Sequence, residues 1–433
     1  MNILDIIEKK KNSEELNKEE IEFFIKNYTE GVIPDYQAAA LIMAICINGM
    51  TQEEILNLTI SMANSGEILD LSDISNNIVD KHSTGGIGDK VTLILSPIIA
   101  SLGIPVAKMS GRGLGITGGT ADKLEAIPGY NTGITIDEFK NNVKEIGISL
   151  ITQTMNLAPA DKKIYALRDV IACTNSIPLI ASSIMSKKIA AGANNIVLDV
   201  TCGKGAFMQN RDQAIKLAKM MKLIGKWAER ETVCVITNMD EPLGYAVGNN
   251  LEMVEAINSL KGNMAPDVEE VVLDLALQMM SLAGYGNNDV SRNKLEVLDA
   301  IKSGKALEKF KELVAKQGGD ISYIDNPEKF EKASIITPII ATQNGYIEEL
   351  DAEIVGRICL DLGAGRKNKE DKIDYTVGIM FTKKVGDKVE KNEVIGYIHA
   401  NDAKKAEDAL LKIKDAYKFG IRSIKKKNVI DII

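Results

Sequence analysis

The sequence predicts a multi-domain α/β fold, in which a small helical domain is interleaved with a large α/β domain and is followed by a C-terminal α+β domain. Residues 1–66 carry apolar side chains at helical spacing, and Thr51 is expected to cap one of these helices. From Ser72 onward, short apolar runs lead into glycine-rich turns and then into helices, which is typical of an α/β domain. Near residue 340 this pattern gives way to strand-like segments with frequent glycine.

These changes of pattern give the domain boundaries. We expect an N-terminal helical domain over residues 1–66, joined in space by a helical insertion at residues 161–192. The α/β domain covers residues 72–335 without that insertion, and the C-terminal domain covers residues 340–433 and ends in a helix from about Ala403 to Phe419. Because helical and α/β segments alternate along the chain, a cleft is expected between them.

Composition limits the possible functions. The chain has 433 residues, 45% of them apolar, a formal net charge of -8 and a pI near 5.2. An acidic chain of this size is expected to fold into several globular domains and to bind a small substrate, with no nucleic acid partner. Five scattered cysteines without CxxC pairs suggest reduced thiols and a cytoplasmic protein. His82 and His399 are too far apart in sequence to suggest a zinc site, and no run of 18 apolar residues predicts a membrane span.

Two glycine-rich loops are candidate phosphate sites. Residues 81–92 read KHSTGGIGDKVT, and residues 108–125 read KMSGRGLGITGGTADKLE. Each places lysine and hydroxyl side chains between an expected strand and an expected helix, where backbone N–H groups can also face an anion. One such loop can be a purely geometric turn, whereas two in one domain favour an anion site.

Two cofactor motifs remain open as alternatives. Gly113-x-Gly115-x-x-Gly118, with Asp137 further on, formally matches a dinucleotide-binding fingerprint, although Pro128 and nearby glycines interrupt the helix that should follow. Residues 197–205, VLDVTCGKG, resemble the first motif of adenosylmethionine-dependent methyltransferases through Asp199. A tight turn after a core strand is the simpler interpretation of that loop.

A third group of candidates lies on the helical insertion. Arg168 lies in the segment YALRD, and Ser183 and Lys187 are four residues apart, so that a hydroxyl and an ammonium share one face of a helix. A solvated helix surface would look similar. The apolar residues on neighbouring turns, including Ile180 and Ile184, argue against that simple interpretation.

Taken together, these segments resemble the thymidine and pyrimidine-nucleoside phosphorylase family. The stretch SGRGLGITGGTADKLE at residues 110–125 fits the family signature throughout, and matches at residues 24–49, 81–89, 165–188 and 363–371 extend the resemblance nearly from end to end. The resemblance implies a small helical domain, a large α/β domain with a central mixed sheet, a C-terminal α+β domain, and a homodimer that forms through the helical domains.

The resemblance also implies roles for individual residues. Phosphate would be held by Lys81, His82, Ser83, Thr92, Lys108, Met109, Ser110 and Thr120. The pyrimidine would be held by Arg168, Ser183 and Lys187, with Leu114 packed on the base. His82, Arg168, Ser183 and Lys187 would be the catalytic residues. Ile116 stands where many relatives carry histidine, so a polar role is absent there.

Pyrimidine-nucleoside phosphorylases also bind potassium, and the resemblance places that ion at Gly88, Lys90, Leu243, Ala246 and Glu255. Many relatives have threonine at the position of Lys90. If the backbone carbonyl of Lys90 is the ligand, the lysine is harmless. If its side chain turns inward, its ammonium group would compete with the ion. No organic cofactor is expected, and phosphate is a co-substrate.

The implied reaction is reversible phosphorolysis of uridine, deoxyuridine or thymidine to the free base and a pentose 1-phosphate. Phosphate would attack C1' directly with inversion, while fixed positive charge and donors stabilise the departing pyrimidine anion. Three alternatives stay open. They are an anthranilate-type phosphoribosyltransferase, a methyltransferase or dinucleotide enzyme built on the Asp199 or Gly113 loop, and a non-enzymatic scaffold.

Overall fold

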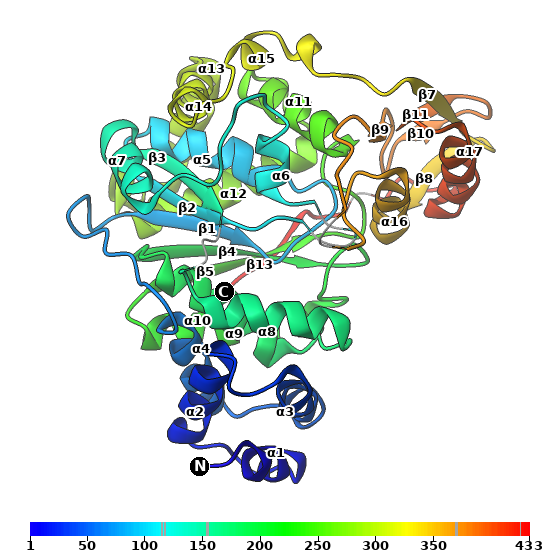
Figure 1. The fold of residues 1–433 in the computed structure, drawn as a ribbon. Helices are drawn as coiled ribbons and strands as arrows, with labels where there is room; N and C mark the ends of the chain where they lie inside the picture. The colour runs from blue at the N-terminus through cyan, green and yellow to red at the C-terminus, as the bar shows by residue number, and fades with distance from the viewer. Residues whose placement is uncertain (114–115, 117, 153–155, 369–370, 425) are drawn as a thin grey trace.

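The computed structural model describes residues 1–113, 116, 118–152, 156–368, 371–424 and 426–433. It has three parts (Figure 1). The N-terminal helices lie at one end, a sheet covered by helices forms the middle, and a smaller domain of short strands and two helices lies beside that sheet. The predicted fold class, with its helical, α/β and C-terminal α+β parts, is confirmed.

Within the described residues, six helices form the helical part. Four are N-terminal: α1 (Ile3–Lys11), α2 (Lys18–Thr29), α3 (Asp35–Asn48) and α4 (Gln52–Ala63). They pack against α8 (Pro159–Val170) and α9 (Ile177–Ala190), which come from the middle of the chain. Thr51 caps α4 as predicted, because its hydroxyl accepts a hydrogen bond from the backbone N–H of Glu54 and the Glu54 side chain accepts one from the N–H of Thr51.

The central sheet has six strands in the order β13, β5, β4, β1, β2, β3. Five are parallel and β13 is antiparallel to β5, so the sheet is mixed. The strands are β1 (Val79–Ser83), β2 (Val106–Ser110), β3 (Ile148–Thr152), β4 (Asn195–Cys202), β5 (Glu231–Asn238) and β13 (Val429–Ile432). Parallel strands with the same direction bring their carboxyl ends, and the loops that follow them, to one edge of the sheet.

Helices cover both faces of this sheet (Figure 1). One face packs against α9 and α10 (Arg211–Trp227), and Ile196, Leu198 and Val200 of β4 point into that layer. The other face packs against α5 (Val91–Ser101) and α12 (Pro266–Leu282). The remaining helices of this domain are α6 (Thr120–Leu124), α7 (Ile136–Ile146), α11 (Asn249–Leu260), α13 (Val290–Lys302), α14 (Lys305–Lys316), α15 (Ser322–Asp325) and the 3-10 turns η1 (Tyr285–Asn288) and η2 (Pro327–Lys329).

The C-terminal part contains two small sheets. One has the order β10, β8, β12 and the other the order β6, β9, β11, β7. Its elements are β6 (Ala246–Val247), β7 (Ile335–Ile340), β8 (Gly345–Leu350), α16 (Ala352–Leu362), β9 (Gly378–Phe381), β10 (Lys388–Val389), β11 (Val394–Ala400), α17 (Ala403–Lys412), η3 (Ile413–Ala416) and β12 (Tyr417–Gly420).

Three sequence predictions about this part need correction. The helix expected from Ala403 to Phe419 ends at Lys412, because Tyr417 to Gly420 pair with β8 as strand β12. Residues 340–433 are not one unit, since β13 completes the central sheet. Conversely, β6 lies within residues 72–335, which were predicted to form the α/β domain, but it pairs with β9 of the C-terminal part. The α/β and C-terminal parts therefore exchange strands.

The chain passes between the helical and α/β parts three times, after α4, after β3 and after α9. These crossings lie side by side. The N–H of Glu67 donates to the carbonyl of Asn156 at 2.8 Å, and the N–H of Leu69 donates to the carbonyl of Ala190 at 2.8 Å. Gly66 is in such close contact that an added Cβ would lie 2.0 Å from the Asn156 oxygen.

No helix within the described ranges is long and apolar enough to cross a membrane.

Candidate active site

The two predicted phosphate loops leave the sheet side by side. One follows β1 after Ser83, and the other follows β2 after Ser110. Because β1 and β2 are parallel neighbours, both loops start at the same edge. The first loop leads directly into α5, which presents its positive N-terminal end on this side. The structure therefore brings the two loops together, as the sequence predicted.

A buried cluster of lysines lies beneath these loops. Lys188, on α9, contacts the Asp80 carboxylate at 2.6 Å and donates to the Met109 carbonyl at 2.9 Å. Lys108 donates to the same carbonyl at 2.9 Å and lies 3.6 Å from Asp80. Burial and the charge of Lys188 lower the pKa of Lys108 to about 7, although Asp80 partly offsets them.

Lys81 is fixed by acidic side chains on two elements. Its Nζ lies 2.9 Å from a carboxylate oxygen of Asp199, on β4, and 3.8 Å from Asp89, in the first loop. Burial alone lowers the pKa of Lys81, but these two carboxylates outweigh it and raise the pKa above its usual value. Lys81 is therefore a stable cation at the base of the loop.

The charges that act on His82 come from both the predicted phosphate residues and the predicted pyrimidine residues. Its pKa lies well below the usual value, first because of burial and then because of the charges of Lys188, Lys108, Lys187 and Lys81. Three of these lysines belong to the cluster beneath the phosphate loops, whereas Lys187 was predicted to bind the pyrimidine. A histidine in this field is neutral near pH 7 and can donate one ring N–H.

The predicted hydroxyl ligands come from the same segments. Ser83 ends β1, and its Oγ accepts a hydrogen bond from the Gly85 N–H at 3.1 Å. Ser110 ends β2 and is buried, while Thr92 lies in the first turn of α5 and Thr120 begins α6.

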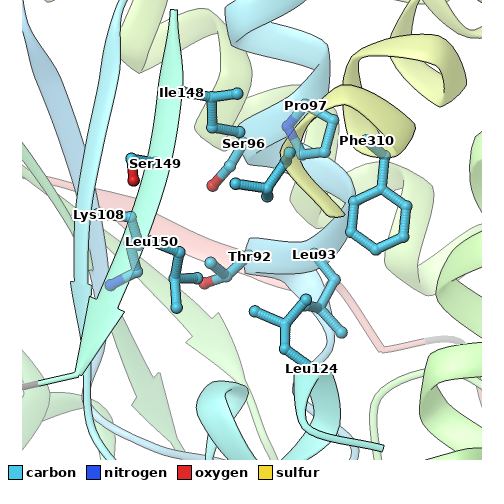
Figure 2. A pocket seen from close by; sticks show the side chains of 11 residues that line it. Thr92, Leu93, Ser96, Pro97, Lys108, Leu124, Ile148, Ser149, Leu150 and Phe310 are labelled. Carbon is cyan, nitrogen blue, oxygen red and sulfur yellow. The ribbon is translucent and has the colours of Figure 1, made fainter. Parts of the chain in front are cut away.

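A small cavity lies behind this site, between β2, β3, α5 and α14 (Figure 2). Thr92, Lys108 and Ser96 contribute to its lining, but most of the surface comes from apolar side chains such as Leu93 and Phe310. The Ser96 hydroxyl has no hydrogen-bond partner among the residues that the structure describes. An apolar lining does not suit a phosphate dianion, so we regard this cavity as a packing void beneath the site.

Arg168 is almost completely buried on α8, and its guanidinium binds three backbone carbonyls. Nε donates to Cys173 at 3.0 Å, Nη1 to Leu179 at 3.1 Å and Nη2 to Thr174 at 2.9 Å. These contacts fix the turn between α8 and α9. Each terminal nitrogen carries two N–H groups, so each has a second N–H that these three hydrogen bonds do not use.

Lys187 and Ser183 lie on one face of α9, as their spacing predicted. Lys187 Nζ is 2.9 Å from Ser183 Oγ and 2.5 Å from a carboxylate oxygen of Asp161 on α8. Burial lowers the pKa of Lys187, and the Asp161 charge offsets only part of that effect. The other Asp161 oxygen is buried and has no hydrogen-bond partner in the described part of the chain.

Three family models and several known proteins match this chain. Family models match residues 75–307 (glycosyl transferase family, a/b domain), residues 4–66 (glycosyl transferase family, helical bundle domain) and residues 346–420 (pyrimidine nucleoside phosphorylase C-terminal domain). A pyrimidine-nucleoside phosphorylase from Bacillus subtilis (strain 168) is 53% identical over 96% of this chain and 95% of its own length. One from Geobacillus stearothermophilus is 52% identical over 93% and 92% of the two chains.

The chain belongs to the pyrimidine-nucleoside phosphorylase family. A solved anthranilate phosphoribosyltransferase from Thermus thermophilus has the same fold, with a TM-score of 0.60 over 72% of this chain and 99% of the other. Its sequence identity is 18%, so that likeness concerns the fold alone.

In this member of the pyrimidine-nucleoside phosphorylase family, the C-terminal part holds the second glycine-rich loop. Arg366 donates to the Gly113 carbonyl at 3.2 Å and to Asp122 at 2.9 Å. Ile116 packs against α16, where a Cβ added to Gly356 would lie 3.2 Å from the Ile116 Cβ. Leu114, predicted to pack on the base, lies outside the described residues.

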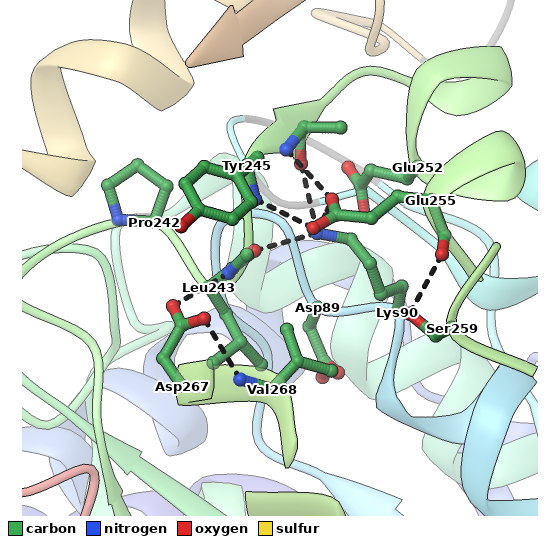
Figure 3. A network of polar contacts seen from close by, with 12 residues as sticks. Asp89, Lys90, Pro242, Leu243, Tyr245, Glu252, Glu255, Ser259, Asp267 and Val268 are labelled. Atoms are coloured by element: carbon green, nitrogen blue, oxygen red, sulfur yellow. Dashed lines mark hydrogen bonds and ion pairs between the residues drawn. The ribbon is translucent and has the colours of Figure 1, made fainter. Parts of the chain in front are cut away.

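The five residues predicted to bind potassium do come together, but around a side chain (Figure 3). Lys90 Nζ lies 2.7 Å from the Leu243 carbonyl, 3.1 Å from the Ala246 carbonyl and 2.8 Å from a carboxylate oxygen of Glu255. The lysine side chain has turned inward, which is the case in which it competes with the ion. With its ammonium in that position, the set does not fit a resident potassium ion.

The methyltransferase-like motif serves this site structurally. Asp199, the acidic residue of the methyltransferase-like motif, accepts a hydrogen bond from Thr237 at 2.6 Å in addition to its ion pair with Lys81. Thr201, in the same motif, donates to the Gly85 carbonyl at 2.5 Å. The third loop thus supports the first one.

Sequence reasoning missed several residues that complete the site. They are Asp80 and Lys188 in the lysine cluster, Asp161 beside Lys187, and Arg366 and Asp122 at the second loop. Only their partners identify them, and those partners lie 26 residues away for Asp161 and 108 for Asp80. Lys188 is the exception, because it adjoins the predicted residue Lys187 in the sequence.

Proposed function

We propose that this protein cleaves pyrimidine nucleosides with inorganic phosphate, giving the free base and a pentose 1-phosphate. The observation that carries the proposal is the placement of Lys187 and Lys188 next to each other on α9. Lys188 reaches the phosphate loops through Asp80 and Met109, whereas Lys187 faces Ser183 and Asp161 in the helical part. The relatives named above, which share about half of all residues with this chain, support the same activity.

In the proposed reaction an oxygen of phosphate attacks C1' of the nucleoside, and the bond between C1' and the pyrimidine nitrogen breaks. The bonding electrons leave with the base, so negative charge appears on the pyrimidine while the new bond forms on the opposite face of the sugar, with inversion. Lys81, Lys108 and the hydroxyls of Ser83, Thr92, Ser110 and Thr120 would bind the phosphate. Lys187, Ser183 and Arg168 would face the base.

The structure of the base group supports a role in stabilising that charge. The carbonyls of Cys173, Thr174 and Leu179 hold the Arg168 guanidinium in one orientation, so its remaining N–H groups need no reorganisation as charge develops. Lys187 keeps Ser183 and Asp161 as partners and carries its charge in a partly buried site, where electrostatic interactions are stronger than in bulk water.

His82 fits the role of a hydrogen-bond donor toward the 2-oxygen of the base. Burial and the charges of four lysines lower its pKa and keep the ring neutral in the absence of substrate. Binding of a phosphate dianion nearby cancels part of that positive charge and raises the pKa of His82. The imidazole is then more easily protonated, and a protonated ring is a stronger hydrogen-bond donor than a neutral one.

The test is an assay of the purified protein with uridine, thymidine and cytidine, each with and without phosphate, following release of free base. We expect cleavage of uridine or thymidine that requires phosphate and persists with a magnesium chelator. A phosphoribosyltransferase would instead require magnesium and a diphosphate substrate. Release of base without phosphate, or no cleavage of any of the three nucleosides, would contradict the proposal.

We also propose how the protein assembles and where in the cell it works. We propose a homodimer through the helical parts, because α3 exposes Tyr36, Met43 and Ile47 to solvent and α8 exposes Val170. We also propose that the protein works in the cytoplasm, which agrees with its five free cysteine thiols.

A further inference from the structure

The loop at residues 241–247 is built around a positive charge. Its carbonyls at Leu243 and Ala246 point toward one centre, and Glu255, on α11, supplies a carboxylate oxygen to the same centre. The ammonium of Lys90, whose side chain is fully buried, occupies that centre at distances of 2.7 to 3.1 Å (Figure 3). Inward-pointing carbonyls and a carboxylate repel one another unless a cation lies between them.

The backbone around this centre is shaped for close approach. Gly88 and Gly244 both adopt positive φ, at 75° and 73°. A Cβ on Gly244 would lie 2.7 Å from Lys90 Nζ, and a Cβ on Gly88 would lie 2.6 Å from the Leu243 oxygen. Glu255 is held in place by the N–H groups of Tyr245 at 2.7 Å and Ala246 at 2.8 Å. The site therefore has a defined geometry whose centre holds one small cation.

We propose that the Lys90 ammonium is the resident cation of this loop, and that the protein needs no separate monovalent metal ion there. An ammonium group and a potassium ion are similar in size and charge, and both take oxygen ligands. The cage has room for one of them, because a second cation within contact distance would meet strong repulsion in a buried site. The cation of this loop is thus part of the chain itself.

The position of Lys90 explains what this cation does. Lys90 immediately precedes α5 and follows Asp89 in the first phosphate loop. A carboxylate oxygen of Asp89 lies 3.8 Å from Lys81 Nζ. On the far side of the 241–247 loop, Lys384 of the C-terminal part donates to the Gly244 carbonyl at 3.0 Å and pairs with Asp267 at 2.7 Å. The Lys90 charge therefore links the phosphate loop to the junction between the α/β and C-terminal parts.

The role of the Lys90 ammonium can be tested without measuring catalytic activity. We would measure the thermal unfolding temperature of the wild type in potassium, sodium and choline chloride at one ionic strength, and the potassium content of the protein after dialysis. We expect the same unfolding temperature in all three salts and no bound potassium. A stabilisation specific to potassium, or about one potassium ion retained per chain, would overturn the inference.

Two variants test the cage itself. Lys90→Thr removes the ammonium and leaves the oxygen ligands unpaired, so we expect its unfolding temperature in choline chloride to fall by roughly 5 °C or more. Potassium should restore most of that loss in a saturable titration, and sodium should restore less. Lys90→Met is the matched control, because its apolar side chain fills the space and should give a loss that potassium does not restore. A Lys90→Thr protein that potassium leaves unchanged would contradict the proposed cation cage, and the wild-type measurements stand if that variant does not fold.

Discussion

At the scale of single residues, Lys187 is a better test of the proposed leaving-group site than Arg168. Replacing Arg168 removes three hydrogen bonds to backbone carbonyls, and bonds from a charged donor contribute about 1.5–3 kcal/mol each. A loss of activity in Arg168→Ala would therefore mix chemistry with a weakened turn between α8 and α9. Lys187 contacts only side chains in the bonds described above, so its replacement disturbs the backbone less.

We expect Lys187→Met to lower kcat by about 10²- to 10³-fold, because the ammonium acts on charge that appears only as the glycosidic bond breaks. Steady-state kinetics with uridine measures the effect. A 5-fluoropyrimidine nucleoside leaves as a more stable anion and should show a smaller deficit. An equal deficit for both substrates, with bond cleavage limiting the rate, would exclude this role for Lys187.

Lys108 predicts how phosphate binding depends on pH. Its pKa of about 7 lies below that of a lysine in an unfolded chain, near 10.4. The unfolded chain therefore binds more protons between these values, and the contribution of Lys108 to the free energy of unfolding rises with pH in this window. Phosphate, in contrast, needs the protonated amine.

We thus expect the dissociation constant of phosphate to increase above pH 7, by up to roughly tenfold per pH unit if only the charged form of Lys108 binds. Calorimetric titration with phosphate between pH 6.5 and pH 9 measures this. Lys108→Met, which cannot titrate, should bind phosphate weakly and lose this part of the pH dependence. An unchanged pH profile in that variant would assign the titration to another group.

The site residues also show what a sequence can and cannot provide at this scale. Lys81, His82 and Lys108 could be predicted because they adjoin glycine-rich turns, where residue type and position carry a local meaning. Asp161 and Asp80 could not, because an isolated aspartate has no meaning until folding places a lysine beside it. The same is true of Lys90. The sequence does not show whether its side chain points away from the potassium site or places its ammonium in that site.

At the scale of elements, α3 has an unusual distribution of apolar residues. Leu41, Ile42 and Ile45 fill the core of the helical part, while Tyr36 and Ile47 are each 74% exposed on the other side. A helix that is apolar on both sides needs a second partner. This observation supports the proposed dimer.

We expect Tyr36→Glu combined with Ile47→Glu to convert a dimer into a monomer, since two carboxylates would be buried without partners in the interface. Light scattering coupled to size-exclusion chromatography gives the mass directly. Val290→Glu, at an exposed apolar position on α13, is the matched control and should leave the mass unchanged. A double variant with the wild-type mass would place the interface elsewhere or exclude it.

Elements defined by local rules were predictable, and elements defined by distant partners were not. The start of α4 follows from Thr51 and Glu54, which are three residues apart and satisfy each other's backbone N–H groups. The end of α17 depends on the pairing of Tyr417 with Leu350, and β13 exists only because β5 offers a free edge. No local sequence pattern predicts where α17 ends or that β13 pairs with β5.

At the scale of the whole molecule, the proposed substrates bind to different parts. The phosphate residues belong mainly to the α/β part and the pyrimidine residues to the helical part, so we expect the two parts to approach each other when both substrates are present. Small-angle scattering should show a smaller radius of gyration with phosphate and a non-cleavable nucleoside analogue together. Phosphate alone serves as the control. An unchanged radius with both ligands would indicate a preformed site.

The three side-by-side crossings between these parts determine what such a motion can be. A domain on one linker could tumble through many orientations, and binding would have to restrict all of them. Here the hydrogen bonds from Glu67 to Asn156 and from Leu69 to Ala190 tie the crossings into a single band. A helical part attached along such a row of crossings can rotate mainly about one axis, which is the line through the crossings. We expect closure to cost the entropy of one angle and to bring Lys187 to the same place relative to the phosphate loops each time.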